Sequence, residues 1–124
     1  MVKIRIDYSV FNYPKPNKKK KGKSKRTKAT EISMKTKKIV WERDNHKCIY
    51  CGKYVPVNYA NAHFIKRSAG GLGIEENIVT LCPECHYEED LGQNTKVYES
   101  YIENYLKDIY GGNWNKENLI YKKY

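Results

Sequence analysis

The sequence contains no long hydrophobic run. No stretch approaches the roughly 20 consecutive apolar residues that a membrane-spanning helix requires. The opening residues, MVKIRIDYSVF, also lack the long apolar segment of a signal peptide. These absences argue against a membrane protein and predict a soluble cytoplasmic protein with no membrane partner.

Apolar residues are also few for a chain that must build a core. They make up 40% of the 124 residues, which suits one small domain with extensions. Domains of this size often gain stability from a disulfide or a bound metal. Since paired cysteines inside cells bind metal more often than they form disulfides, the four cysteines predict a metal site.

Acidic residues are scarce in the first third of the chain. Residues 1–43 contain 15 lysines and arginines and 3 acidic residues, whereas residues 44–124 contain 9 and 11. Residues 15–28 hold nine basic side chains and no acidic one, so like-charge repulsion predicts disorder in isolation. Such an arm favours nucleic acid as a partner over a solubilising or sorting role. The side chains expected to contact phosphates are Lys18, Lys19, Lys20, Lys21, Lys23, Lys25 and Arg26.

Hydrophobic spacing predicts one short strand and two helices. Weak alternation indicates a strand within residues 1–13. Helical spacing indicates a helix over residues 33–44 and another from about Thr95 to Tyr110, which Gly111 and Gly112 end. The second helix is expected to pack on the core, rather than stack its tyrosines on bases, through Val97, Tyr101, Ile102, Tyr105, Leu106 and Ile109.

Two Cys-x-x-Cys pairs stand in the middle of the chain. Cys48 and Cys51 form the first pair, Cys82 and Cys85 form the second, and 30 residues separate the two pairs. Each gap lets the backbone turn so that both sulfurs face one ion, and two such turns give the four-thiolate shell of structural zinc. Separate redox pairs or disulfides are the alternative. Since four cysteines leave no open coordination position, this zinc is expected to be structural and not catalytic.

Histidines and an asparagine lie between and beside these pairs. The elements occur in the order Cys48-x-x-Cys51, Ala62-His63-Phe64-Ile65, Gly70-Gly71, Glu76-Asn77-Ile78-Val79-Thr80-Leu81 and Cys82-x-x-Cys85-His86. This order, over residues 41–91, resembles the HNH endonucleases with a ββα-metal core, a family with many small bacterial and phage members. The resemblance implies that His63 is the general base, that Asn77 braces the loop between two strands, and that His86 binds a catalytic divalent ion.

The chemistry of phosphodiester hydrolysis agrees with these roles. The reaction needs a base for the attacking water, a cation for the leaving group and rigid positioning. Histidine, with an unperturbed pKa of about 6.5, can be a neutral base near pH 7. Asp90 follows His86 by four residues on the predicted helix, so the two can clamp one ion, with Glu89 as the competing ligand. A carboxylate there favours Mg²⁺ or Mn²⁺, with Ni²⁺ as a further candidate.

The stretch around His63 also departs from the family pattern. Many members carry aspartate or histidine just before the general base as a further metal ligand, whereas this chain has Ala62. This difference predicts weak metal affinity and leaves an inactive, degenerate nuclease as an alternative. Lys66 and Arg67 follow in a glycine-rich loop, where one of them is expected to hold the scissile phosphate; a solvated loop is the alternative.

These features together predict a small α+β fold. Its ββα-metal HNH core is expected over residues 31–94, cross-linked by a four-cysteine zinc site. A basic, partly disordered arm over residues 1–30 precedes the core. A C-terminal helix and tail over residues 95–124 follow and pack on it. The expected function is metal-dependent DNA cleavage, by nicking or double-strand cutting, in the cytoplasm of a bacterium or a phage-infected cell. A non-catalytic zinc-stabilised DNA- or RNA-binding module and a nuclease of branched DNA are the alternatives. A phage origin would make packaging or recombination proteins candidate partners, and the oligomeric state stays open.

Overall fold

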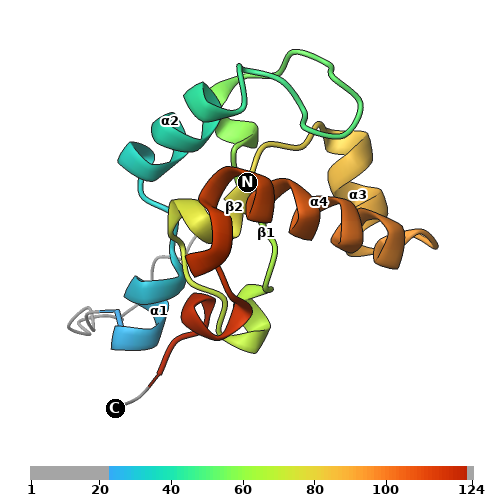
Figure 1. Cartoon of the computed structure of the whole chain (residues 1–124). Helices are drawn as coiled ribbons and strands as arrows, with labels where there is room; N and C mark the ends of the chain where they lie inside the picture. The colour runs from blue at the N-terminus through green and yellow to red at the C-terminus, as the bar shows by residue number, and fades with distance from the viewer. Residues whose placement is uncertain (1–22, 123–124) are drawn as a thin grey trace, which may run out of the picture.

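A two-stranded sheet lies between two pairs of helices. The computed structural model describes residues 23–122. Helices α1 (Lys25–Thr30) and α2 (Met34–Arg43) lie on one side of strands β1 (Ala62–His63) and β2 (Ile78–Val79), and α3 (Pro83–Asp90) and α4 (Thr95–Tyr110) lie on the other (Figure 1). The strands are antiparallel, with Ala62 opposite Val79 and His63 opposite Ile78. The order β1, β2, α3 confirms the predicted small α+β class.

Short 3₁₀ helices fill the connections between these elements. They are η2 (Val57–Tyr59), η3 (Arg67–Ala69), η4 (Glu75–Asn77), η5 (Gly111–Asn113) and η6 (Lys116–Leu119). The strand expected within residues 1–13 lies outside the described residues. Within residues 23–122, none of the helices has the length and apolar character needed to cross a membrane.

Local side-chain chemistry explains where the longer helices begin and end. The Ser33 hydroxyl accepts the amide N–H of Thr36 at 3.1 Å, which satisfies a free donor in the first turn of α2. Helix α4 ends at Gly111, whose φ of 77° lies in the left-handed region that glycine adopts without a steric penalty. The helices expected over residues 33–44 and from Thr95 to Tyr110 are therefore confirmed.

The end of the basic stretch is folded and packed on the core. Residues 25–30 form α1, and Thr30 at its end is buried. The Gly73 amide donates to the Ala29 carbonyl at 2.9 Å, and a Cβ at Gly73 would come within 1.9 Å of the Glu31 carbonyl oxygen. Disorder of residues 15–28 was expected from charge alone. That expectation concerned the stretch in isolation; in the whole chain residues 25–28 belong to α1, which contacts the loop between β1 and β2.

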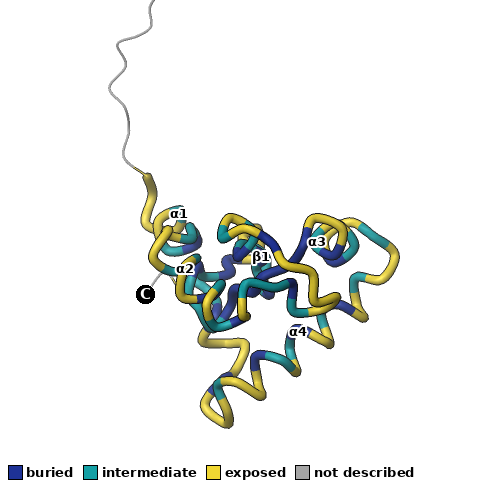
Figure 2. Tube along the Cα trace, turned by 90° about the horizontal axis from the view of Figure 1, so that it is seen from above, coloured by how far each residue is buried: buried dark blue, intermediate teal, exposed yellow. Residues whose placement is uncertain are grey.

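The core lies where the sheet meets α3 and α4 (Figure 2). Helix α4 faces it with Tyr98, Ile102 and Leu106, all buried. The predicted stripe is wrong for Val97, Tyr101 and Ile109, which stay 54%, 42% and 40% exposed. Helical spacing is compatible with a buried face that contains Val97 and with one that contains Tyr98. The packing of α4 against α3 buries the face that contains Tyr98.

A buried ion pair joins α2 to β2 and α4. The Arg43 guanidinium contacts both carboxylate oxygens of Asp44, at 2.7 and 3.0 Å. It also donates to the backbone carbonyls of Glu75 and Ile78, each at 2.8 Å. The Asp44 carboxylate in turn accepts the Tyr105 hydroxyl at 2.6 Å. The network positions the β-strands against the flanking helices.

Candidate active site and zinc site

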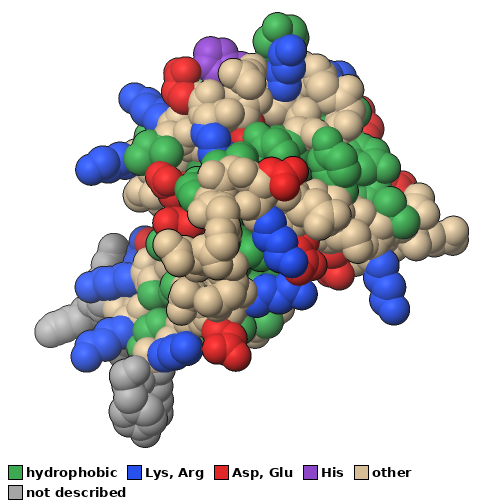
Figure 3. All heavy atoms as spheres, viewed as in Figure 1, with side chains coloured by type: hydrophobic (Ala, Val, Ile, Leu, Met, Phe, Trp, Pro, Cys, Tyr) green, Lys and Arg blue, Asp and Glu red, His purple; other side chains and the backbone are tan. Residues whose placement is uncertain are grey.

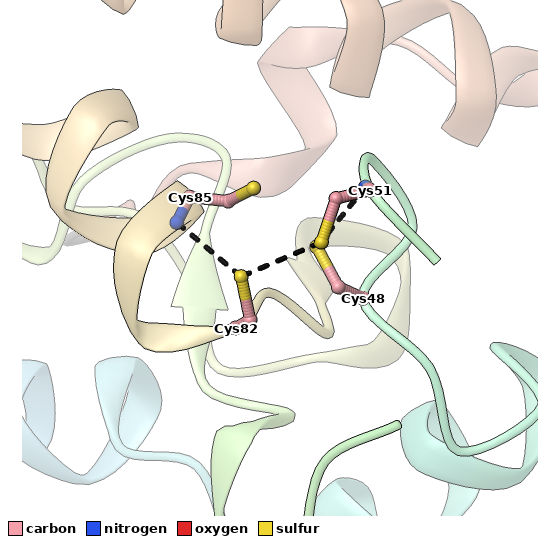
Figure 4. Close-up of side chains that lie close together, drawn as sticks. All are labelled: Cys48, Cys51, Cys82 and Cys85. Atoms are coloured by element: carbon pink, nitrogen blue, oxygen red, sulfur yellow. Dashed lines mark hydrogen bonds between the residues drawn. The ribbon is translucent and has the colours of Figure 1, made fainter. Parts of the chain in front are cut away.

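The four cysteines converge on one point between the loop after α2 and the start of α3 (Figure 4). Their sulfur atoms all lie within 4.8 Å of one another, and Cys51 Sγ is 3.6 Å from Cys82 Sγ. In each pair the second amide donates to the first sulfur, Cys51 N to Cys48 Sγ at 3.5 Å and Cys85 N to Cys82 Sγ at 3.4 Å. Four soft sulfur donors in a closed cluster fit a structural metal such as zinc.

Burial disfavours the thiolate form of two of the four cysteines, Cys82 and Cys85. The thiols of Cys82 and Cys85 have pKa values above the ordinary range, chiefly because burial disfavours the thiolate. A coordinated cation reverses that preference, since metal-bound thiols are deprotonated. A bound cation would therefore favour the ligating thiolate form of Cys82 and Cys85.

His63 lies on β1 with its ring held by a residue from α1. Its Nε2 is 2.9 Å from the Thr30 carbonyl oxygen. A carbonyl oxygen can only accept a hydrogen bond, so Nε2 carries the proton and Nδ1 is the basic nitrogen. Nothing in the sequence links residues 30 and 63, and sequence reasoning missed this contact.

The surroundings of His63 favour its neutral form. Its pKa lies below the ordinary 6.5, chiefly because burial disfavours the imidazolium ion. The hydrogen bond to Thr30 acts in the opposite direction, while the positive charges of Arg67, Lys66 and His86 lower the pKa further. His63 is therefore ready to accept a proton near neutral pH.

His63 lines a surface hollow of about 290 Å³ that carries basic side chains. The residues around it are Glu31, Ile32, Lys37, Asn61, His63 and Arg67. The Arg67 guanidinium is 3.3 Å from the Thr30 hydroxyl, which fixes it beside the histidine. Arg67 was expected to hold phosphate, and the hollow adds Lys37, which the sequence pattern did not single out.

Asn77 ties together the loop that joins the strands. Its side chain is fully buried, accepts the Ile65 amide at 2.8 Å, and donates to the carbonyls of Ile65 at 3.2 Å and Leu72 at 2.8 Å. Its own backbone carbonyl accepts the Phe64 amide at 2.8 Å. These bonds clamp residues 64–72 directly behind His63.

The residues expected to clamp the catalytic ion lie on α3. His86 and Asp90 line the same hollow of about 310 Å³, as their four-residue spacing on a helix requires. His63 lines the other hollow, described above, and not this one. Within residues 23–122, only the four cysteines form a group of three or more histidine, cysteine or acidic residues whose ligand atoms lie close enough to bind one ion. Ala62 is fully buried in the apolar core and offers no ligand.

Lys66 points toward α3. Its Nζ forms an ion pair with Glu89 Oε2 and lies 3.2 Å from Asp90 Oδ1. Burial raises the pKa of the fully buried Glu89 carboxyl, and Lys66 partly offsets that effect. This pairing differs from the phosphate contact expected for Lys66 and leaves Arg67 as the nearer candidate for that contact.

Basic side chains gather on the surface over α1 and α2 (Figure 3). Of the residues expected to bind phosphates, Lys25 and Arg26 lie on α1 and are exposed, and Lys23 pairs with Glu31. Arg26 also donates to the carbonyls of Arg67 and Ser68, at 3.2 and 3.1 Å. Lys18, Lys19, Lys20 and Lys21 lie outside the described residues. The described part of the basic stretch thus adjoins the loop that follows His63.

A β-hairpin followed by a helix, closed by four cysteines and carrying histidines on β1 and α3, defines the ββα-metal class of folds. Residues 48–90, about a third of the chain, match the family described as HNH endonuclease. The matched segment runs from the first cysteine to Asp90 and includes His63, Asn77 and His86. No curated protein matches the chain. The family indicates a nuclease or nucleic-acid-binding function, with nucleic acid as the partner.

Proposed function

We propose that the protein is a metal-dependent DNA endonuclease with His63 as its general base. The observation that carries this proposal is the hydrogen bond from His63 Nε2 to the Thr30 carbonyl. It fixes the tautomer in which Nδ1 can accept a proton, on a ring whose burial keeps it neutral. A histidine that served only to fill the core would have no reason to line a hollow with Arg67 and Lys37.

The chemistry follows from these groups. His63 Nδ1 takes the proton of a water molecule as that water attacks the phosphorus. Arg67 and Lys37 hold the phosphate oxygens, and Asn77 keeps the loop that carries Arg67 in place. His86 and Asp90 would hold a divalent ion, with Mg²⁺ or Mn²⁺ favoured by the carboxylate, and such an ion would supply positive charge for the leaving oxygen. The basic arm adds sequence-independent phosphate contacts.

Replacing His63 by alanine tests the proposal. Supercoiled plasmid is incubated with the zinc-loaded protein and Mg²⁺, Mn²⁺ or Ni²⁺, and nicked and linear products are quantified. We expect a rate loss of about 10²- to 10⁴-fold, the usual contribution of a general base. His46→Ala is the matched control, because His46 lines neither hollow and should leave the rate unchanged.

Two outcomes would contradict the proposal. Undiminished nicking by His63→Ala would remove His63 as the base. Tight DNA binding by the wild-type protein without cleavage in any of the three ions would favour the second candidate, a zinc-stabilised binding module.

The pH dependence of cleavage supplies a second test. Because the pKa of His63 is lowered, its basic form persists to a lower pH than that of an ordinary histidine. We expect kcat/KM to stay high as the pH falls to 6.5 and to decline only below that value, as Nδ1 becomes protonated. An NMR titration of the ring protons, assigned by comparison with His63→Ala, should give the same midpoint. A midpoint above 6.5 would show that burial does not control this histidine.

A further inference from the structure

Thr30, the last residue of α1, contacts two residues of the candidate site through different atoms. Its backbone carbonyl oxygen is 2.9 Å from His63 Nε2. Its hydroxyl oxygen accepts hydrogen bonds from Nε and Nη2 of Arg67, each at 3.3 Å. Thr30 is itself buried. One buried residue thus joins the proposed general base to the residue proposed to hold the phosphate.

The direction of the Thr30 hydroxyl is fixed by its own helix. The hydroxyl donates to the Arg26 carbonyl, one turn earlier in α1, at 2.9 Å. A hydroxyl has one hydrogen to donate and two lone pairs that accept. Because the hydrogen is used within α1, the lone pairs are left to accept from the Arg67 guanidinium. The side chain of Thr30 is therefore an acceptor with a defined orientation.

This contact uses one edge of the Arg67 guanidinium and not the other. Nε and Nη2 form the side edge, which faces Thr30. Nη1 and the second hydrogen of Nη2 form the end of the group, and Arg67 is exposed. Two parallel N–H groups match two oxygens of a phosphate. Holding the side edge therefore presents the end of the guanidinium to a phosphate in the hollow.

The backbone that carries Arg67 is held by the same helix. Arg26 donates to the carbonyls of Arg67 and Ser68, at 3.2 and 3.1 Å. Helix α1 lies outside residues 48–90, the segment that matches the family. Both the backbone and the side chain of Arg67 are thus fixed by an element that the family segment does not contain.

We propose that Thr30 is a positioning residue for Arg67 as well as for His63, and that its hydroxyl directs the end of the Arg67 guanidinium at the scissile phosphate. The inference rests on the proposed function, because it explains how that site orients its substrate. Helix α1 then completes the active site at the point where the basic arm joins the core. The arm that is expected to meet DNA would end directly on the groups that act on it.

Thr30→Val tests the inference, because valine keeps the branched shape and the backbone carbonyl but removes the hydroxyl. Plasmid cleavage by the zinc-loaded full chain is measured with Mn²⁺. We expect kcat/KM to fall by about 10- to 100-fold, since a small misplacement of a positioning group can cost that much. Thr30→Ser retains the hydroxyl and should restore most of the rate. Thr27→Val is the matched control on α1, where the hydroxyl contacts Ser24, and should cleave as the wild type does.

Two further readouts separate positioning from a general loosening of α1. Arg67→Met is prepared alone and together with Thr30→Val. If Thr30 acts through Arg67, its substitution costs little once the guanidinium is gone, so the two losses are not additive. The midpoint of the pH dependence of kcat/KM should be the same in Thr30→Val as in the wild type, because the carbonyl that holds His63 remains.

Binding of a short DNA duplex without added divalent ion tests the same contact apart from cleavage. Fluorescence anisotropy gives the Kd of each zinc-loaded protein. We expect Arg67→Met to weaken binding, Thr30→Val to weaken it by a smaller factor, and Thr27→Val to leave it unchanged. Tight binding without cleavage by the wild type would count against the nuclease, while the binding comparison would still test Thr30.

Three results would overturn the role of Thr30. The first is cleavage and binding by Thr30→Val equal to those of the wild type. The second is an equal loss of rate from Thr30→Val whether residue 67 is arginine or methionine. The third is a shifted pH midpoint in Thr30→Val, which would show that α1 has moved away from His63.

Discussion

Replacing Cys48 by serine is expected to abolish the folded state of the domain. Cys48 is buried, and its sulfur is one of the four that face a common point. Structural zinc contributes on the order of 10–16 kcal/mol of apparent binding energy to a small domain. The total free energy of unfolding of a domain is only about 5–15 kcal/mol. Losing much of the free energy of zinc binding would therefore leave the modest core unable to keep the domain folded.

The experiment compares zinc content and fold in the same samples. Zinc stoichiometry is measured by mass spectrometry, and secondary structure by far-ultraviolet circular dichroism. We expect Cys48→Ser to lose both signals together, and a chelator to have the same effect on the wild type, reversed when zinc is restored. A zinc-free variant that keeps its helical signal and a cooperative melt would show that the apolar core suffices alone.

Replacing Arg43 by methionine is expected to destabilise the protein by about 3–5 kcal/mol, the loss seen when one partner of a buried ion pair is removed. Methionine retains most of the side-chain volume but leaves Asp44, which is 4% exposed, without its cation. It also leaves the Glu75 and Ile78 carbonyls without their donor. The phenol of Tyr105 cannot compensate, because burial raises its pKa and keeps it a neutral donor to Asp44.

Urea denaturation measures this loss as the change in the free energy of unfolding. Lys38→Met is the matched control, since Lys38 lies exposed on the same helix and its loss should stay within about 0.5 kcal/mol of the wild type. Similar values for the two variants would mean that the buried Asp44 carboxylate does not depend on Arg43 for its compensation. A large loss of unfolding free energy in Arg43→Met alone would show that the Arg43–Asp44 network holds α2, β2 and α4 together.

The bounds of the two predicted helices and the spacing within each cysteine pair follow from local sequence. The spacing within each Cys-x-x-Cys pair brings its two sulfurs together, whereas the meeting of the two pairs depends on the fold. Helix α4 ends at Gly111 because of backbone conformation at that residue alone. The charge of residues 15–28 predicted disorder of this stretch in isolation. It could not predict that residues 25–30 form a helix against the loop between β1 and β2.

The order of residues in the chain was enough to predict which residues form the candidate site. It was not enough to predict which side chains and backbone groups surround them. The sequence by itself determined that His63, Asn77, His86 and Asp90 share one segment with the cysteines, because that order is a family pattern. The tertiary structure alone decided that Thr30 holds His63, that Lys66 pairs with Glu89, and that Tyr98 faces the core instead of Val97. Each of these depends on contacts between elements distant in sequence, and such contacts form only when burial brings those elements together.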